Sequence, residues 1–264
     1  KKLRLGYTTG TCAAAATKAA VQMLFRGTKA EWVEFVTPKG ILLKLPVEHI
    51  TMSEDFVTCA VKKDAGDDFD VTDGAYVYAC VSRIRQGFAV EGGEGIGRVT
   101  KPGLDQPVGS AAINSTPRRM MVEVMMEEAD NYGYEGGLRT VISVPEGVNM
   151  AKRTLNEKLG IMDGISILGT SGIVEPMSET ALVDTIRAQL SMYSAQGQKD
   201  LIITPGNYGE SFLSDKLELD LEHTVKCSNF IGETIDIACE FRMKSLLLIG
   251  HLGKLVKLGS GIMN

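Results

Sequence analysis

Two adjacent arginines, Arg118 and Arg119, stand where the sequence predicts the start of a helix. Thr116 is a suitable N-cap, and Pro117 is favoured as the first helical residue. The positive end of the helix dipole disfavours cations there, and such local conflicts tend to mark functional sites. An anion would resolve the conflict, because free N–H groups and two guanidinium groups could converge on one or more carboxylates. The alternative is that both side chains point into solvent.

A glycine-rich segment at residues 91–103 carries two more cations, Arg98 and Lys101, together with Glu94. It lacks the G-x-G-x-x-G spacing of a dinucleotide site, and no helix follows it directly. Glycines let a backbone approach a ligand closely, so the segment is either a binding loop or a flexible hairpin.

Aspartates are dense at residues 61–74, beside Lys62 and Lys63. Acidic clusters suggest a metal, but the spacing fails the EF-hand pattern and the closing glutamate is missing. A solvated acidic turn is the simpler interpretation, and no metal site is predicted.

Small and polar residues follow four short apolar segments in the second half of the chain, at residues 169–172, 204–210, 228–230 and 250–253. In open α/β sheets, ligands bind at the edge where such loops meet. His251 is the one histidine beside such a loop, which makes it a candidate base, although most lone histidines are structural.

These residues need elements to position them. Thr8 or Thr9 can cap a helix over residues 10–25 that is rich in alanine. Short strands are expected at residues 31–36, 41–46, 56–61, 75–85 and 140–144, with helices at 117–132 and 149–159. Beyond residue 160, strands at 165–168, 201–204, 224–226 and 245–249 alternate with helices at 179–195, 211–217 and 231–243. This alternation indicates βαβ units. The prediction is an α+β first domain over residues 1–160, followed by an α/β Rossmann-like domain with a mostly parallel sheet over residues 161–264.

The composition excludes several classes of protein. The 264 residues carry a net charge of −5, so there is no general basic field for nucleic acid. No apolar run approaches the ~20 residues that span a bilayer, and no signal peptide is indicated. We expect a soluble, cytoplasmic protein without a membrane partner, and a homo-oligomer is possible. The five cysteines show no zinc spacing and are expected to be reduced thiols: Cys12, Cys59, Cys80, Cys227 and Cys239.

Several stretches, taken in order, resemble one family. They are Gly6–Ala14, Lys62–Asp68, Gly92–Gly103, Ala112–Asn114 with Pro117-Arg118, Gly164–Ser178, Thr204–Glu210, Ser228–Glu233 and Gly250–Leu258. The family is that of the cobalt-precorrin-5B C-1 methyltransferases of oxygen-independent cobalamin biosynthesis, the CbiD family. The chain departs from it at Phe69 and Asp73, where the family usually has proline and histidine, and at Asn156–Gly160. Members continue beyond the position of Asn264, which implies a second domain truncated at its C-terminus.

The resemblance implies an enzyme that methylates C-1 of cobalt-precorrin-5B to give cobalt-precorrin-6A. S-adenosylmethionine would be the methyl donor, and cobalt would arrive inside the corrinoid substrate. The first domain would bind the carboxylated macrocycle through Thr8, Thr9, Lys62, Lys63, Arg98, Lys101, Asn114, Arg118 and Arg119. The second would bind the donor through Gly169, Thr170, Gly172, Thr204, Gly206, Asn207 and Gly250. Candidate bases are His251, Glu94 and Asp64.

Two other classes of function stay open on the sequence. One is a non-catalytic carrier that binds a tetrapyrrole or a nucleotide. The other is a nucleotide-dependent oxidoreductase, which the missing G-x-G-x-x-G and Walker patterns disfavour. Titration with S-adenosylhomocysteine and NAD separates them, because a carrier should bind neither and an oxidoreductase only NAD.

Overall fold

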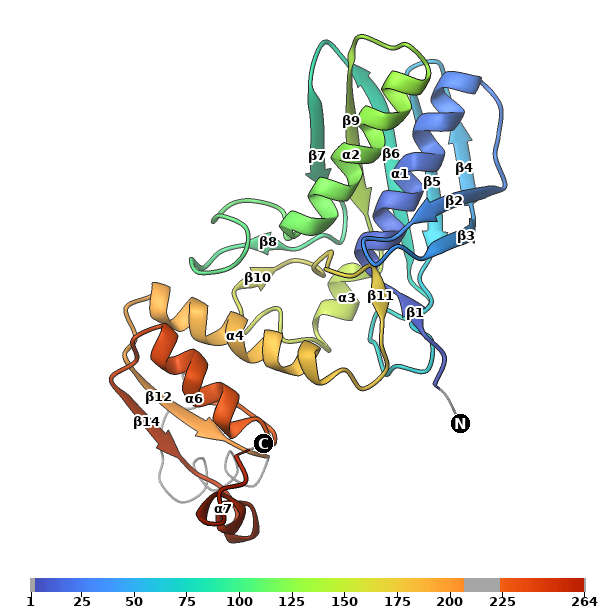
Figure 1. Ribbon diagram of the computed structural model, residues 1–264. Coiled ribbons are helices and arrows are strands. Elements are labelled where there is room, and N and C mark those ends of the chain that lie inside the picture. Colours follow the sequence, from blue (N-terminus) through green and yellow to red (C-terminus); the bar gives the residue numbers. More distant parts are fainter. Residues whose placement is uncertain (1–2, 207–223, 264) are drawn as a thin grey trace. The chain divides into compact units, whose positions relative to one another are not determined.

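The computed structural model describes residues 3–206 and 224–263 (Figure 1). The chain forms two compact units. The first comprises Lys1–Thr100 and Asp105–Met177, and the second comprises Lys101–Leu104 and Ser178–Asn264. Within the described ranges, no helix is long and apolar enough to cross a membrane.

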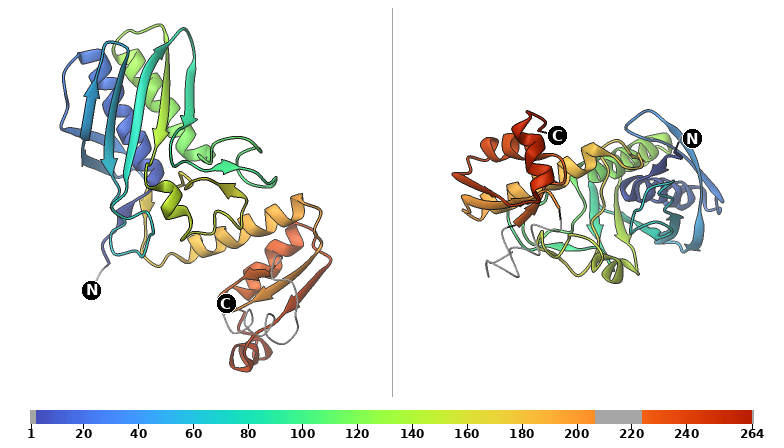
Figure 2. Two further views of the ribbon diagram at one scale, coloured as in Figure 1. Left: turned by 180° about the vertical axis from the view of Figure 1, so that it is seen from behind. Right: turned by 90° about the horizontal axis from the view of Figure 1, so that it is seen from below.

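A five-stranded sheet with two helices on one face forms the first unit. The strand order is β4-β5-β6-β9-β7, in which β7 runs parallel to β9 and the other neighbours are antiparallel. The helices α1 and α2 lie side by side over this sheet (Figures 1 and 2). The bounds are α1 Thr9–Arg26, β4 Glu48–Met52, β5 Phe56–Lys62, β6 Tyr76–Ile84, β7 Phe88–Gly92, α2 Ser115–Asn131 and β9 Gly137–Ser143.

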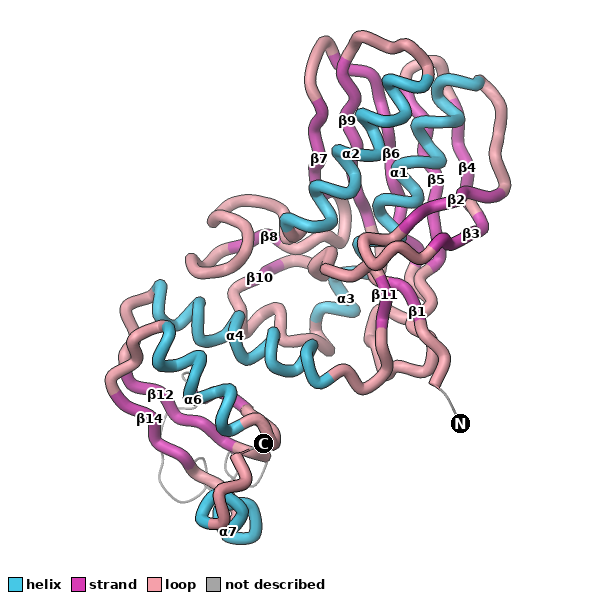
Figure 3. Tube along the Cα trace, in the orientation of Figure 1, coloured by secondary structure: helices cyan, strands magenta, loops and turns pink. Residues whose placement is uncertain are grey.

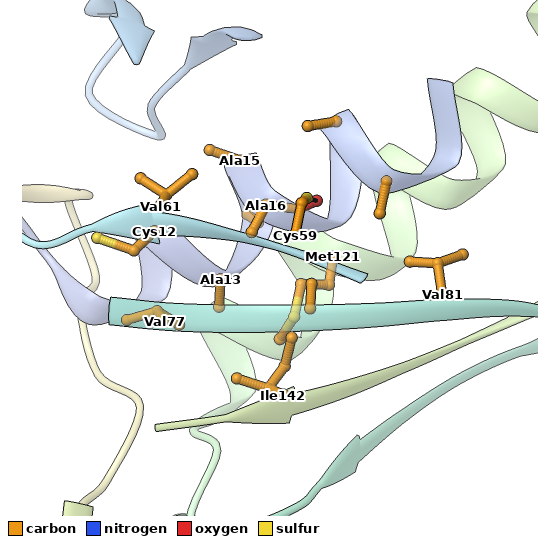
Figure 4. Close-up of a cluster of buried hydrophobic side chains, with 14 of the residues drawn as sticks. Cys12, Ala13, Ala15, Ala16, Cys59, Val61, Val77, Val81, Met121 and Ile142 are labelled. Carbon is orange, nitrogen blue, oxygen red and sulfur yellow. Dashed lines mark hydrogen bonds between the residues drawn. The ribbon is translucent and has the colours of Figure 1, made fainter. Parts of the chain in front are cut away.

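Small side chains let α1 pack closely on the sheet. Thr8 caps the helix by accepting a hydrogen bond from Thr11 N at 3.2 Å. The helix ends at Gly27, whose φ of 68° suits a left-handed cap that glycine adopts without cost. Buried alanines such as Ala13 and Ala16 face strands β5 and β6 (Figure 4). This contact forms the centre of the core.

Short pairings complete the first unit. A hairpin joins β2 (Trp32–Val36) to β3 (Leu42–Pro46). Two-residue strands pair β1 (Gly6–Tyr7) with β11 (Ile173–Val174), and β8 (Arg98–Val99) with β10 (Ile161–Met162). The helix predicted over residues 149–159 is confined to α3, Gly147–Ala151.

Three parallel strands form the sheet of the second unit, in the order β13-β12-β14. Figure 3 shows the helices α4 and α6, which pack on each other, beside strands of this sheet. Ser178 caps α4 by accepting a hydrogen bond from Ala181 N at 3.3 Å. The bounds are α4 Glu179–Ala195, β12 Asp200–Thr204, β13 Thr224–Lys226, α6 Ile231–Glu240, β14 Ser245–Leu248 and α7 Leu252–Gly259. The Rossmann-like class of this unit stays a prediction, and the helix expected at residues 211–217 lies outside the described residues.

The predicted strand at residues 165–168 does not belong to the parallel sheet. Ile165 pairs with Ile96, and Ile167 pairs with Ile113, through single bridges in the first unit. Both isoleucines are buried there. A short apolar segment looks the same in sequence whichever core it enters, so the expected boundary near residue 160 is displaced to the Met177–Ser178 junction.

Candidate functional site

The loop at residues 168–172 closes the N-terminus of α1. Thr9 Oγ1 accepts a hydrogen bond from Leu168 N at 3.0 Å. Thr8 N donates to Gly172 O at 3.0 Å. These contacts engage both threonines within the protein, so the structure gives no support to the predicted substrate contacts there.

Gly169, Thr170 and Gly172 of this loop do not lie where the sequence predicted them. The sequence places these residues at the edge of the parallel sheet, but they lie in the first unit. A Cβ atom at Gly169 would overlap the Thr8 side chain, so packing against α1 requires this glycine. The physical reason is that Ile167 is buried in the core of the first unit and carries the following loop to α1.

Lys63 is an internal cation rather than a surface one. Its residue exposure is 2%, and its Nζ lies 2.9 Å from Asp70 Oδ2. Burial raises the pKa of Asp70, but the charge of Lys63 and hydrogen bonds from Thr72 outweigh burial and lower the pKa overall. Lys62 is exposed, with its Nζ 5.6 Å from the centre of the Tyr76 ring. The two lysines therefore do not form one anion site.

Asp64 serves the structure of the acidic turn. It accepts hydrogen bonds from Arg4 Nη2 at 2.9 Å and from Gly66 N at 2.8 Å. The hydrogen bond from Arg4 is the main cause that lowers the pKa of Asp64. A carboxylate with a lowered pKa and engaged oxygens is a poor general base, so the predicted role is not supported.

An acidic side chain of the protein itself occupies the start of α2. The helix begins at Ser115, and its N-cap residue Asn114 makes no side-chain capping bond. Instead, Asp105 Oδ2 accepts hydrogen bonds from Ser115 N at 2.6 Å and from Ser115 Oγ at 2.9 Å. A carboxylate stabilises the positive end of the dipole. Asp105 thus supplies one carboxylate to this terminus, and the predicted cap Thr116 lies inside the helix.

Arg118 is anchored to three main-chain oxygens and does not extend freely into solvent. Its Nε and Nη1 donate to Ile113 O and Val90 O, both at 2.8 Å, and its Nη2 donates to Ala111 O at 3.2 Å. Burial is the main cause that lowers the pKa of Arg118, although a guanidinium remains charged in proteins. This side chain ties α2 to β7 and to the segment before the helix.

Arg118 also lines a small pocket with Arg98. The pocket has a volume of about 300 Å³. Arg98 is exposed and donates from Nη1 to Gly109 O at 3.3 Å. We call it the arginine pocket; its lining residues are Val90, Glu91, Gly92, Arg98, Ser110, Ala111 and Arg118. The structure thus brings together two predicted substrate-binding arginines from separate motifs.

Two glycines of the glycine-rich segment lie against other parts of the protein, whereas Glu91, Gly92 and Arg98 of the same segment line the arginine pocket. Gly95 has a φ of 72°, and a Cβ atom there would overlap Val144 O. A Cβ atom at Gly97 would lie 2.9 Å from Gly164 O. The glycines therefore allow chain segments of the protein itself to cross. Glu94 is exposed, and its main-chain oxygen accepts from Val144 N at 2.9 Å.

Arg119 faces a different and larger groove, of about 690 Å³. Its Nε lies 3.8 Å from Glu123 Oε1. Lys18 lines the same groove and lies 3.8 Å from the buried Glu128. With Glu127 also on the wall, the acids balance or exceed the cations, so this groove does not suit a polyanion. Lys101 belongs to the second unit and lines neither pocket.

Loops after the three parallel strands meet in the second unit. Lys254 Nζ donates to Pro205 O at 2.7 Å and to Asn229 Oδ1 at 3.1 Å. A Cβ atom at Gly250 would lie 2.7 Å from Pro205 Cγ, so the first and third loops touch. The hydroxyl of Thr204, at the end of β12, is buried and has no hydrogen-bond partner within the described ranges.

His251 caps α7. Its Nδ1 accepts a hydrogen bond from Gly253 N at 3.2 Å. The residue is exposed at the same edge of the sheet, where no described atom lies within 4 Å of a Cβ position at Gly206. Asn207 lies outside the described residues. In the part of the chain that the structure describes, no group of histidine, cysteine, aspartate and glutamate side chains could hold a metal ion.

The CbiD family model matches residues 1–176. This chain belongs to the CbiD family. It is 52% identical, over 264 residues, to the cobalt-precorrin-5B C(1)-methyltransferase of Ruminiclostridium cellulolyticum, covering 100% of this chain and 69% of that one. The enzyme of the same name from Alkaliphilus metalliredigens is 48% identical over 263 residues, covering 99% and 69%. The crystal structure of the cobalamin biosynthesis protein cbiD from Archaeoglobus fulgidus matches with a TM-score of 0.54 and 30% identity, covering 98% of this chain and 80% of that one.

Two residues of the arginine pocket, Glu91 and Ser110, were not predicted from the sequence of this CbiD chain. Glu91 lines it and accepts a hydrogen bond from Arg139 Nη2 at 2.5 Å. That ion pair depends on the parallel pairing of β7 with β9, which no local pattern reveals. Ser110 also lines the pocket, and its place just before the matching stretch Ala112–Asn114 was the only available signal.

Proposed function

We propose that this chain transfers the methyl group of S-adenosylmethionine to C-1 of cobalt-precorrin-5B, giving cobalt-precorrin-6A. The observation that carries this proposal is the match, along the whole chain, to relatives named cobalt-precorrin-5B C(1)-methyltransferase at 52% and 48% identity. Cobalt belongs to the substrate, so the protein needs no metal ligands of its own for this reaction.

The acceptor is a macrocycle with several acetate and propionate carboxylates. Its binding requires local cations in a chain whose net charge is −5. Arginines suit this task, because a guanidinium presents a rigid fork of N–H donors to a carboxylate. We place the acceptor on the first unit, where Arg98 and Arg118 line one pocket.

The donor site in this proposal is the edge where the loops of the second unit meet. Within the described ranges the hydroxyl of Thr204 has no hydrogen-bond partner, and no described atom lies within 4 Å of a Cβ position at Gly206. Ligands commonly bind at this edge of open α/β sheets. Holding the sulfonium methyl group in line with C-1, away from water, would supply much of the rate enhancement.

The direct test is to incubate the chain with cobalt-precorrin-5B and methyl-labelled S-adenosylmethionine. We expect the label to appear in the macrocycle, together with S-adenosylhomocysteine. A titration with S-adenosylhomocysteine and NAD accompanies the assay, and only the former should bind. Binding of NAD alone, or of neither nucleotide with no transfer of label, would refute the proposal.

A further inference from the structure

The arginine pocket is small and carries an excess of positive charge. Its volume of about 300 Å³ is at the lower limit for small-molecule sites, so it fits one side chain of a macrocycle rather than the ring. Among the described residues, neither Arg98 nor Arg118 has a carboxylate within salt-bridge distance. The one acid on its wall, Glu91, is already paired with Arg139.

Arg118 is held in a fixed orientation at the base of α2. Its hydrogen bonds to Ile113 O, Val90 O and Ala111 O use three of the five N–H donors of a guanidinium. Two donors remain for a ligand within the described part of the chain. The nearby Asp105 caps Ser115 through Oδ2; among the described residues it makes no hydrogen bond to Arg118, although its charge favours the guanidinium.

Arg98 supplies the second cation from a different strand. It lies in β8, and its residue pairs with Ala111, which also lines the pocket. Its side chain makes a long hydrogen bond of 3.3 Å to Gly109 O, which a stronger acceptor can replace at small cost. The fixed guanidinium of Arg118 and the more loosely held guanidinium of Arg98 thus both line the arginine pocket.

We propose that the arginine pocket is a carboxylate subsite, which takes one acetate or propionate side chain of the acceptor macrocycle. The inference rests on the proposed function and deepens it. Arg118 sets the position of the carboxylate, and Arg98 closes on it from the pocket wall. The larger groove beside Arg119 does not compete for this role, because Glu123 and Glu127 line it.

The test compares two cobalt corrinoids that differ in side-chain charge. Cobyrinic acid carries free carboxylates, and cobinamide carries amides in their place. Calorimetric titration of the 264-residue chain should give tighter binding of cobyrinic acid. The variant Arg98→Ala should lower that affinity about 10-fold, the value of one hydrogen bond to a charged group, and leave cobinamide binding unchanged.

Arg119→Ala is the matched control for Arg98→Ala. It also removes one exposed positive charge, but Arg119 does not line the arginine pocket. It should change neither affinity by more than about 2-fold. Arg118→Lys keeps the charge but loses the fork, so it should weaken cobyrinic acid by at least about 10-fold. Should Arg118→Lys fail to fold, the cobyrinic acid affinity of Arg98→Ala alone tests the subsite.

Equal losses for Arg98→Ala and Arg119→Ala would overturn the subsite, because net charge alone would then control binding. An unchanged affinity in Arg98→Ala, with methyl transfer intact, would also overturn the subsite but leave the proposed function standing. A wild-type chain that binds neither corrinoid and transfers no methyl group would overturn both.

Discussion

At the scale of single residues, the buried pair of Lys63 and Asp70 shows why charged residues in a sequence motif need not contact substrate. Lys63 is 2% exposed, and within the described residues its Nζ forms a salt bridge with Asp70 Oδ2 at 2.9 Å. A buried pair contributes little compared with apolar residues, but removing one member leaves an uncompensated charge. These two charged residues of the motif therefore serve the stability of the fold.

We predict that Asp70→Asn lowers the free energy of unfolding by ~3–5 kcal/mol at pH 7, because Lys63 loses its carboxylate partner. Urea unfolding measures this loss. Asp67→Asn is the control, since Asp67 is exposed and its amide oxygen can still accept from Arg4 N. A loss of equal size in both variants would contradict the internal role of the pair.

The pH dependence of this loss follows from the lowered pKa of Asp70. A carboxyl group whose pKa is lower in the folded state stabilises the protein above its unfolded pKa of ~3.9, and that contribution is lost as the pH falls through the folded pKa. The stability difference between wild type and Asp70→Asn should therefore shrink below about pH 4. A difference that stays constant down to pH 2 would argue against this cause.

At the scale of elements, α2 depends on the contacts that anchor its first turn. Arg118 binds three main-chain oxygens, from Val90 in β7 and from Ala111 and Ile113 before the helix. The helix dipole opposes a cation at this position, but three accepting oxygens and Asp105 nearby offset it. Arg118 at the start of α2 is thus explained mainly by its hydrogen bonds, which hold α2 against β7.

We predict that Arg118→Ala lowers the free energy of unfolding by ~2–4 kcal/mol, because three carbonyl groups lose a charged donor in a half-buried position. Arg119→Ala, whose side chain is largely exposed, should change it by less than ~0.5 kcal/mol. Thermal and urea unfolding of the two variants provide the comparison. If Arg118→Ala is as stable as Arg119→Ala, the anchoring contacts do not hold in solution.

Gly95 tests the crossing of chain segments in the glycine-rich region. Gly95→Ala should destabilise the protein by more than Gly87→Ala, although both glycines have a positive φ, of 72° and 79°. The added Cβ would overlap Val144 O at Gly95, whereas nothing lies within 4 Å at Gly87. Gly87→Ala should cost only the ~1 kcal/mol of a left-handed alanine, and urea unfolding measures the excess at Gly95. Equal losses would mean that the backbone relaxes around the new methyl group.

At the scale of the whole molecule, local patterns predicted the elements better than their partners. The alanine-rich helix α1 and the parallel strands β12, β13 and β14 follow the predicted ranges closely. The sequence did not show that Ile165 and Ile167 join the first unit, because each is held there by a single bridge. It also did not show that Lys101–Leu104 belongs to the second unit.

The candidate site also depends on contacts between segments that are far apart in the sequence. Arg98 and Arg118 were identified by type and by local conflict, but their shared pocket arises from β7, β8 and the start of α2 together. Gly169 and Gly172 were assigned to the wrong unit for the same reason, since a glycine-rich turn carries no information about the core beside it. Residue chemistry was therefore predictable, and its assembly was not.

The division into two units allows donor and acceptor binding to be tested separately. Gly206 follows β12, and no described atom lies within 4 Å of a Cβ position there, so we expect Gly206→Trp to fold and to place an indole where we propose that the donor binds. Gly259→Trp is the control, because this glycine of α7 also has no described atom within 4 Å of a Cβ position and no positive φ. We expect Gly206→Trp to weaken S-adenosylhomocysteine binding at least about 10-fold, which corresponds to ~1.4 kcal/mol, and to leave cobyrinic acid binding unchanged.

Arg98→Ala should weaken cobyrinic acid binding and leave S-adenosylhomocysteine binding unchanged, since Arg98 belongs to the first unit and Gly206 to the second. Calorimetric titration of both ligands against the three variants measures these effects, and a Gly206→Trp protein that binds S-adenosylhomocysteine as Gly259→Trp does would exclude the donor from this edge of the sheet.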